Sequence, residues 1–429
     1  MVFNFNFIFM FMKNEAENKK LLKSEKNERK IKDESKKLKE ETEKTRNKTQ
    51  ENKDKKIIQE GRVKISVDDG VFYNPFMEIN RDISSLAVGA LVLIKELGRL
   101  NACDGMAASG IRGLRYLVEN DNVDSVTFVD GDEQACNLIK KNIEQNLNLE
   151  SSKKTEVVCD DINHHLYRGG KRYNFIELDP FGSPVPFIRD ALLNLRGSKI
   201  GILSVTATDT AVLCGAHPKA CVINYGAKPM HNSICHEVGL RILIADIVRT
   251  AAPMHLGITP LFSISKRHYM KVILLVNKSA KKAYESMSNL GFVSMCQGCM
   301  DIETYEKPHI PTKCNICGEN LDWAGPLWLG PIFDEAILKE MKLLNQKREY
   351  RNKKEIESLL KIMIEESKMP AFYYDLHAIA DHFSIPSPSF DIVMNELKNK
   401  GYSVTRTHFN PTAIKTDAKA KEIIEILKK

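Results

Sequence analysis

Four segments of the chain end in acidic side chains whose chemistry suits a cationic or hydroxyl-rich ligand. Each acid follows a short apolar run: Asp104, Asp130, the pair Asp160 and Asp161, and Asp179. Carboxylates attract an ammonium or a sulfonium, and a carboxylate at a strand end can bind a ribose diol. These acids form one site only if the preceding runs are neighbouring strands whose carboxyl ends meet at one edge of a sheet.

The pattern of apolar runs and turn residues in residues 60–278 predicts such a sheet. Short apolar runs read as buried strands at residues 123–132, 155–161, 173–180 and 199–209. Helical patterns separate them, and alternation of strand and helix is typical of a parallel, doubly wound sheet. The last two runs, within residues 260–276, are broken at residues 266–268, which predicts an antiparallel hairpin that closes the sheet.

The turn after the first strand favours S-adenosylmethionine as the ligand. The sequence LNACDGMAASGIRG is rich in small residues, which let a ligand approach the backbone, but it is neither GxGxxG nor a Walker motif. The turn therefore lacks the features that bind phosphates, whereas a sulfonium, an α-ammonium and a ribose fit the acids. The predicted class is a class I, Rossmann-like methyltransferase. A generic nucleotide-binding sheet is the alternative, and Asp160 or Asp161 alone could equally cap a helix.

The segment FIELDPFGSP, residues 175–184, carries the predicted catalytic group. Pro180 ends the strand after Asp179, and Gly182 permits a tight turn. An acid followed by proline and an aromatic residue resembles the (Asp/Asn)-Pro-Pro-(Tyr/Phe) signature of methyltransferases that modify exocyclic amines of bases. Such an amine is a poor nucleophile, and Asp179 would orient it and accept its proton. Phe181 would stack on the base, or else lie in the core.

Further motifs make the resemblance specific. DPFGSP lacks the second proline of that signature, and with the other motifs the chain closely resembles the tRNA guanine-N2 dimethyltransferases that act at position 26. The match runs from about residue 60 to the C-terminus. The motifs are VFYNPFMEINRD, AASGIRGLR, SVTATDTAVLCGAHPKAC, CHEVGLRIL, GPLWLGP and TRTHFNPTAIKTD.

This resemblance implies the activity and the roles of the site residues. The donor would be S-adenosylmethionine, and the acceptor the N2 amine of guanine 26 in tRNA, giving N2-methyl- and N2,N2-dimethylguanosine. Phe72 and Phe181 would hold the flipped guanine between them, with Asp179 as the proton acceptor. From spacing alone, Phe72 would be a core residue, and Arg81 and Arg112 surface ion pairs. The cofactor-binding residues implied are Arg81, Asp104, Arg112, Asp130 on the ribose, and Asp160, Asp161 and Ile162 at the adenine edge.

Four of the ten cysteines have the spacing of a metal site. Cys296, Cys299, Cys314 and Cys317 form two C-x2-C pairs separated by 14 residues. This is the spacing of a tetrahedral, structural zinc site with no position left for catalysis. Iron in a rubredoxin-like site is the alternative.

The C-terminal part has the order of a winged helix. Residues 375–383 and 389–402 read as amphipathic helices joined by SIPSP, and residues 403–409 as a short strand. His408 in this part could contact RNA or cap a turn, and the structural role is favoured. The predicted domains are an N-terminal extension (1–58), a catalytic domain (59–278), a zinc-binding region (279–330) and a C-terminal tRNA-binding domain (331–429).

Charge says little about the partner of the folded part. Residues 13–58 carry 17 basic and 11 acidic side chains, or +6 of the total +7, so the remaining chain is near neutral. We expect the extension to be disordered, as a solvated tail or an RNA-binding arm. Affinity for tRNA would come from local patches such as residues 342–354. No apolar run reaches the length of a membrane span, and we expect a cytoplasmic protein.

Two other classes of function stay open on the sequence alone. The first is a DNA or protein amino-methyltransferase that uses the same acid on its fourth strand. The second is a non-catalytic RNA-binding protein with zinc and winged-helix modules, against which the four intact strand-end acids argue.

Overall fold

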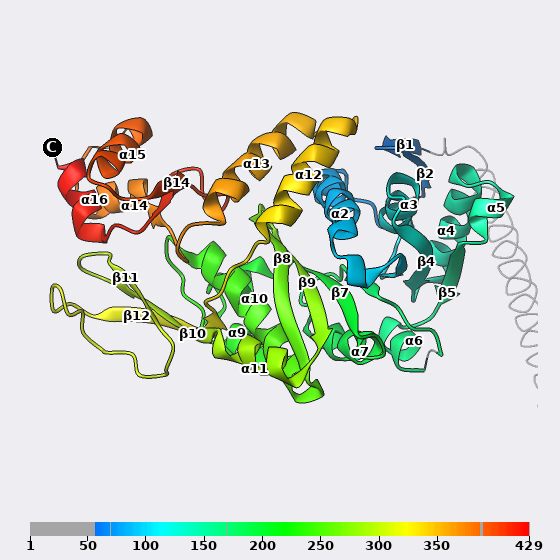
Figure 1. Ribbon diagram of the computed structural model, residues 1–429, viewed down its shortest axis with the longest axis horizontal. Coiled ribbons are helices and arrows are strands. Elements are labelled where there is room, and N and C mark those ends of the chain that lie inside the picture. The colour runs from blue at the N-terminus through cyan, green and yellow to red at the C-terminus, as the bar shows by residue number, and fades with distance from the viewer. Residues whose placement is uncertain (1–55, 69, 169, 387–388, 429) are drawn as a thin grey trace, which may run out of the picture. The chain divides into compact units, whose positions relative to one another are not determined.

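The central element of the computed structural model is a seven-stranded sheet (Figure 1). The structure describes residues 56–428 except 69, 169 and 387–388, so the predicted N-terminal extension lies almost entirely outside the described residues. The strand order is β5-β4-β3-β6-β7-β9-β8. The strands are β3 (Leu100–Gly105), β4 (Val123–Asp130), β5 (Thr155–Cys159), β6 (Phe175–Leu178), β7 (Ile200–Ala207), β8 (Leu256–Lys266) and β9 (Tyr269–Lys278).

The topology confirms the predicted doubly wound sheet with a closing hairpin. Strands β5, β4, β3, β6 and β7 are parallel, and β9 pairs antiparallel with both β7 and β8. All four residues of β6 are buried, because helices cover both faces of the sheet. The helices of this part of the chain are α3 (Ile111–Glu119), α4 (Glu133–Asn146), α5 (Leu149–Ser152), α6 (Ile162–Arg168), α7 (Val185–Leu195), α8 (Thr210–Leu213), α9 (Pro218–Tyr225), α10 (Cys235–Ala251), η4 (Ala252–Met254) and α11 (Ala280–Ser288).

The order of strands reverses between β3 and β6, and this reversal locates the ligand site. After β3 the chain continues to β4 on one side of the sheet. After β6 it continues to β7 on the other side, so the loops after β3 and β6 diverge. In open α/β sheets a ligand binds in the crevice opened by such a reversal, beyond the carboxyl ends of the strands.

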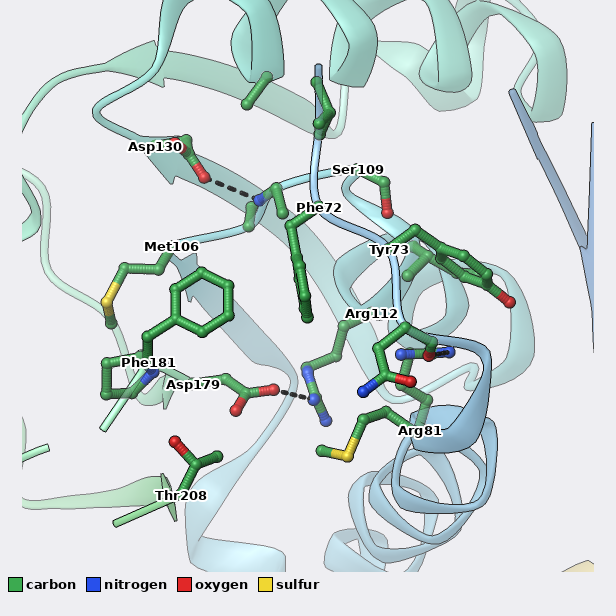
Figure 2. A pocket seen from close by; sticks show the side chains of 18 of the residues that line it. Phe72, Tyr73, Arg81, Met106, Ser109, Arg112, Asp130, Asp179, Phe181 and Thr208 are labelled. Carbon is green, nitrogen blue, oxygen red and sulfur yellow. Dashed lines mark hydrogen bonds and ion pairs between the residues drawn. The ribbon is translucent and has the colours of Figure 1, made fainter. Parts of the chain in front are cut away.

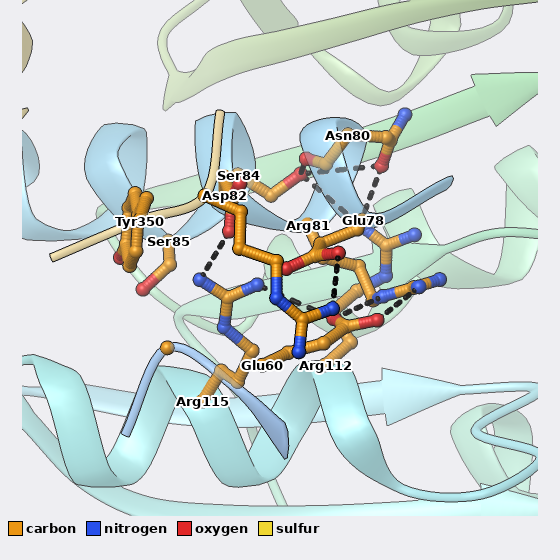
Figure 3. Close-up of polar contacts among 12 residues, drawn as sticks. Glu60, Glu78, Asn80, Arg81, Asp82, Ser84, Ser85, Arg112, Arg115 and Tyr350 are labelled. Carbon is orange, nitrogen blue, oxygen red and sulfur yellow. Dashed lines mark hydrogen bonds and ion pairs between the residues drawn. The ribbon is translucent and has the colours of Figure 1, made fainter. Parts of the chain in front are cut away.

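A hairpin and a helix precede the sheet and are joined to it by buried charges (Figure 3). Glu60 accepts hydrogen bonds from Arg81 at 2.5 and 2.8 Å, and Arg115 of α3 pairs with Asp82 at 2.7 Å and with Glu119 at 3.0 Å. Because all five side chains are buried, each charge depends on its partners. These N-terminal elements are β1 (Lys56–Glu60), β2 (Val63–Val67), η1 (Pro75–Met77), α2 (Glu78–Ala90), η2 (Leu91–Leu93) and η3 (Lys95–Leu97).

The cysteine-bearing region forms a three-stranded antiparallel sheet of order β11-β10-β12, and the residues after it are helical. Its strands are β10 (Leu290–Cys296), β11 (Ile302–Tyr305) and β12 (Leu321–Trp328), and the two helices that follow are α12 (Glu335–Lys347) and α13 (Lys353–Glu366). Helix α12 packs on α2. In the segment between the two helices, Arg348 is not a surface cation: it donates to Asn120 at 2.6 Å and to the Tyr350 hydroxyl at 2.7 Å.

The C-terminal elements confirm the predicted order of helix, turn, helix and β wing. The small sheet has the order β13-β15-β14, and helices α14 and α15 precede the wing strand β14. The elements are β13 (Tyr374–Asp375), α14 (Leu376–His382), α15 (Phe390–Asn399), β14 (Val404–Arg406), β15 (Ala413–Thr416) and α16 (Ala420–Leu427). Within the described residues, no helix is both long and apolar enough to cross a membrane.

His408 has a structural position in this C-terminal part, as expected. Its side chain is fully buried, and Nδ1 lies 2.7 Å from Glu366 Oε2. Lys415 Nζ lies 3.4 Å from Glu366 Oε1 and 2.8 Å from Glu237 Oε1, at the start of α10. A buried cluster of charges therefore fixes the C-terminal elements to the helix that covers the catalytic sheet.

The Glu366 carboxylate is expected to make stability depend on pH. Burial by itself would raise the pKa of Glu366, but the charges of His408 and Lys415 lower the pKa from 4.5 to about 2. The contribution of the charged Glu366 carboxylate to the free energy of unfolding is therefore complete above pH 4.5 and is lost as the pH falls through 2. Glu366→Gln should lower the free energy of unfolding at pH 7 by about 3 kcal/mol, from 2.5 pKa units at about 1.4 kcal/mol each.

Urea unfolding at pH 7, 4.5 and 3 measures this effect. The difference between the wild type and Glu366→Gln should shrink as the pH falls from 4.5. Glu335→Gln, which changes a partly exposed partner of Lys339 and Lys368, is the matched control and should lower the midpoint much less than Glu366→Gln does. An equal loss at all three pH values would contradict the assignment to charge.

Candidate active site

A cavity of about 750 Å³ lies at the carboxyl ends of β3, β4 and β6, at the reversal of strand order (Figure 2). Three of the four predicted acidic positions line it, namely Asp104, Asp130 and Asp179. Two aromatic rings, Phe72 and Phe181, stand at the same cavity. The structure therefore brings together residues that are separated by more than one hundred positions in the sequence.

The turn after β3 is shaped for close approach to its backbone. Met106 and Ala108 have φ angles of 59° and 49°, and Gly110, which precedes α3, has a φ of 73°. Asp130 holds this turn, because its Oδ2 accepts from the Ala108 N–H at 2.8 Å and its Oδ1 accepts from the Asp132 N–H at 2.9 Å. Each carboxylate oxygen has a further lone pair, so Asp130 is positioned by the backbone and still able to accept from a ligand.

Asp179 is fixed by Arg112. Arg112 Nη2 donates to Asp179 Oδ2, while Arg112 Nη1 donates to Asn80 Oδ1 at 2.8 Å and to Ser84 Oγ at 3.0 Å. Arg112 is buried, and the Asp179 side chain is 23% exposed. Among the described residues no hydrogen bond to Asp179 Oδ1 occurs, so this oxygen is the one available to a group in the cavity.

A chain of buried charges lies beneath Asp179. Glu177, two residues earlier on β6, pairs with Lys271 of β9 at 2.5 Å and accepts from the Tyr116 hydroxyl at 2.8 Å. Burial by itself would raise the pKa of Glu177, but the charges of Lys271 and Arg112 outweigh it and hold the pKa below its ordinary value. Arg112 Nε lies 4.0 Å from Glu177, so one guanidinium faces both carboxylates of the strand.

Asp104 is the most strongly perturbed acid of the cavity. Burial raises its pKa from 3.8 to about 7, although Arg112 and the Gly113 N–H favour its charged form. Its Oδ2 accepts from that N–H at 2.9 Å. A cationic group bound in the cavity would favour the charged form of Asp104 and lower its pKa again.

Phe72 and Phe181 touch each other across the mouth of the cavity. Their ring centroids are 4.6 Å apart, and the ring planes meet at 80°, an edge-to-face contact. Phe72 is 52% exposed and Phe181 is 76% exposed, so neither is the core residue of the alternative interpretation. Gly182, with a φ of 79°, turns the chain after Phe181, and its N–H donates to Thr208 Oγ1 at 2.7 Å.

The other predicted site residues occupy different places. Arg81 lines the cavity, but its guanidinium is engaged by Glu60 and by the Asn74 carbonyl at 3.0 Å. Spacing alone predicted surface ion pairs for Arg81 and Arg112, and this is wrong because both are buried. The three residues predicted at the adenine edge do not line the cavity: Asp160 pairs with His164 at 2.6 Å, Asp161 caps α6, and Ile162 is buried against Gly105.

One polar residue that lines the cavity was missed by sequence reasoning. The hydroxyl of Tyr269 is buried and makes no hydrogen bond within the described part of the chain. A buried donor of this kind is suited to a ligand carboxylate. Together with the carboxylates and the small-residue turn, it fits an amino-acid group and a ribose, two polar parts of S-adenosylmethionine. In the sequence, Tyr269 was part of an apolar β run.

The four predicted metal ligands meet at one point. The sulfur atoms of Cys296, Cys299, Cys314 and Cys317 lie within 4.8 Å of one another. Cys296 and Cys317 are 3.3 Å apart, and Cys299 and Cys314 are 3.7 Å apart. The N–H groups of Gly298 and Ile316 donate to Cys296 and Cys314 respectively, the arrangement of two zinc knuckles.

The fold and the site define a class I, S-adenosylmethionine-dependent methyltransferase, and comparisons give the family. The sequence matches the family described as N2,N2-dimethylguanosine tRNA methyltransferase over residues 46–428, and the chain belongs to this family.

Individual relatives agree with this family. The tRNA (guanine(26)-N(2))-dimethyltransferase of Methanosphaera stadtmanae is 37% identical over 87% of this chain and 97% of its own length. The enzyme of the same name from Methanobrevibacter smithii is 39% identical over 85% and 93%. Trm1 from Pyrococcus horikoshii, solved with S-adenosyl-L-methionine, is 34% identical, covers 87% of this chain and 100% of its own, and superposes with a TM-score of 0.78.

Proposed function

We propose that this chain transfers methyl groups from S-adenosylmethionine to the exocyclic N2 of guanine 26 in tRNA, giving N2-methyl- and then N2,N2-dimethylguanosine. The observation that carries the proposal is Asp179 Oδ1, which is available to a ligand, beside two exposed aromatic rings at the switch point of the sheet. Family membership supports the same reaction.

Asp179 and its neighbours account for the reactivity of the amine. The lone pair of an exocyclic amine is delocalised into the guanine ring, so the amine attacks weakly. With Arg112 fixing Oδ2, Oδ1 would accept an N–H of the amine and direct its lone pair. S-adenosylmethionine supplies an activated methyl group: the N–C bond forms as the C–S bond breaks, and the amine proton passes to Asp179. Phe72 and Phe181 would hold the base, and Asp130 and Asp104 the ribose and the cationic group.

The reaction is tested with unmodified tRNA transcripts, labelled S-adenosylmethionine and nucleoside analysis by mass spectrometry. We expect label in N2-methylguanosine and N2,N2-dimethylguanosine, and a transcript with adenine at position 26 should lose both. Label in DNA or protein instead of tRNA would favour the alternative methyltransferases. Binding of tRNA without any transfer, and without binding of S-adenosylmethionine in calorimetry, would favour the non-catalytic alternative.

Removal of one ring of the aromatic pair should weaken binding of the target base. Stacking of a base on an aromatic side chain is worth about 1–3 kcal/mol, so Phe181→Ala should lower kcat/KM by about 5- to 150-fold. Steady-state kinetics with a tRNA transcript measures this, and calorimetry should show unchanged affinity for S-adenosylmethionine. Phe76→Ala, which removes a cavity-lining ring that is 73% exposed, is the matched control. An equal loss in both variants would refute a specific stacking role.

We further propose that the cysteine quartet holds one structural Zn²⁺. Four protein ligands at tetrahedral spacing leave no open position, so the ion would stabilise the sheet of β10, β11 and β12 without entering the reaction. Cys314→Ser should therefore lose one equivalent of metal and unfold at a lower temperature, while its affinity for S-adenosylmethionine stays within about twofold. Elemental analysis, thermal unfolding and calorimetry measure these three quantities. Iron instead of zinc in the elemental analysis would identify the rubredoxin-like alternative.

A further inference from the structure

A second group of metal-ligating side chains lies outside both the cavity and the cysteine quartet. Cys214 directly follows α8, and Cys235 and His236 begin α10. Their ligand atoms all lie within 4.8 Å of one another, and Cys214 Sγ is 3.5 Å from His236 Nδ1. Cys214 is buried, while Cys235 and His236 are partly exposed. The twenty residues between the two cysteines form α9 and its flanking loops, so the chain returns to this point.

Backbone packing fixes the positions of these side chains. Gly215 has a φ of 84°, and a Cβ there would lie 2.9–3.0 Å from backbone atoms of Met230 and His231. A Cβ on Gly239 of α10 would lie 3.0 Å from the Leu213 carbonyl oxygen. His231 Nδ1 also donates to the Cys214 carbonyl at 3.0 Å. The residues on both sides of Cys214 are therefore in direct backbone contact with α10 and the loop before it.

The distance between Cys214 and His236 suits a mixed sulfur and nitrogen site for zinc. With Zn–S of about 2.3 Å and Zn–N of about 2.0–2.1 Å, a tetrahedral angle places sulfur and nitrogen about 3.6 Å apart. This value matches the 3.5 Å between Cys214 and His236.

We propose that Cys214, Cys235 and His236 form a second Zn²⁺ site, with a fourth position open to water on the partly exposed side. The ion would tie α8 to the N-terminus of α10. Helix α8 follows Thr208, whose N–H donates to the Gly182 carbonyl at 3.0 Å, one residue after Phe181. The second site would therefore support the loop that carries the aromatic ring of the cavity.

Metal content of full-length protein purified with added zinc tests the proposal. We expect two equivalents for the wild type, one for Cys235→Ser and none for Cys235→Ser combined with Cys314→Ser. Because Cys314→Ser removes only the quartet, its remaining equivalent reports the second site alone. Loaded with Co²⁺, Cys314→Ser should show cobalt–thiolate charge-transfer absorption at about half the intensity of Cys235→Ser, since two thiolates replace four.

Two further measurements keep the test decisive if Cys235→Ser folds poorly. His236→Ala, which leaves both thiols in place, should also lose one equivalent. In the wild type, zinc should slow alkylation of Cys235 at least tenfold, and chelation by EDTA should restore the rate. A single equivalent in the wild type together with no metal in Cys314→Ser would overturn the proposal. A Cys214–Cys235 disulfide in protein kept under reducing conditions would do the same.

Discussion

Replacing Asp179 by alanine is expected to lower kcat by about 10²- to 10⁴-fold, the usual contribution of a positioned proton acceptor. Asp179→Asn should be less damaged, because an amide oxygen can still accept the amine N–H although it is a poor acceptor for the proton. The expected order of kcat is wild type, then asparagine, then alanine. Single-turnover kinetics with saturating S-adenosylmethionine and a tRNA transcript measures the chemical step.

The comparison needs a control for the loss of a negative charge. Asp124→Ala removes a half-exposed carboxylate near the start of β4, the strand that ends at Asp130, and it should leave kcat unchanged. Calorimetry should also show that Asp179→Ala binds S-adenosylmethionine, since Arg112 keeps its contacts with Asn80 and Ser84. A fully active Asp179→Ala protein would remove this residue from the mechanism.

Lys271→Met is expected to lower the free energy of unfolding by about 3–5 kcal/mol, a large effect for one substitution. Lys271 and Glu177 are both fully buried, so removal of the lysine leaves the Glu177 carboxylate without its closest cation in a site without water contact. Arg112, at 4.0 Å, compensates only in part. Chemical denaturation followed by circular dichroism measures the change.

A double variant separates the charge from the packing. Glu177→Gln combined with Lys271→Met removes both charges together and should recover most of the stability lost by Lys271→Met alone. Lys281→Met, which breaks the exposed Lys281–Glu285 pair on α11, is the control and should leave the unfolding midpoint unchanged. If the double variant is no more stable than Lys271→Met alone, the loss does not come from the unpaired charge of Glu177.

The main sheet could be predicted because strands that are buried on both faces consist of continuous apolar runs, which are visible in the sequence. Residues 173–180 and 199–209 were predicted as strands, and β6 and β7 lie within them. The break at residues 266–268 likewise indicated the turn between β8 and β9. The strands β10, β11 and β12 could not be found in this way. The four cysteines lie at the end of β10 and between β10 and β12, in a sequence with little alternation of apolar and polar residues.

Polar contacts between distant segments could not be predicted, because sequence patterns do not encode them. Arg112 pairs with a residue 67 positions away, and Arg348 reaches Asn120 across 228 positions. Periodicity describes which side of an element is apolar, but it does not tell which cation meets which carboxylate once the elements pack. For the same reason Tyr269 was hidden within an apolar run, although its hydroxyl lies at the cavity.

The edge-to-face contact of Phe72 and Phe181 has a consequence for selectivity by size. A base that stacks between two rings needs about 7 Å, twice the van der Waals separation of about 3.5 Å, whereas the ring centroids are now 4.6 Å apart. Entry therefore has to break an existing contact. A free nucleoside has only its own stacking energy to offset that separation, whereas a tRNA also gains contacts far from the base. If Phe72 and Phe181 hold the base as proposed, discrimination against free guanosine would begin at this pair of rings, before any atom of the base edge is read.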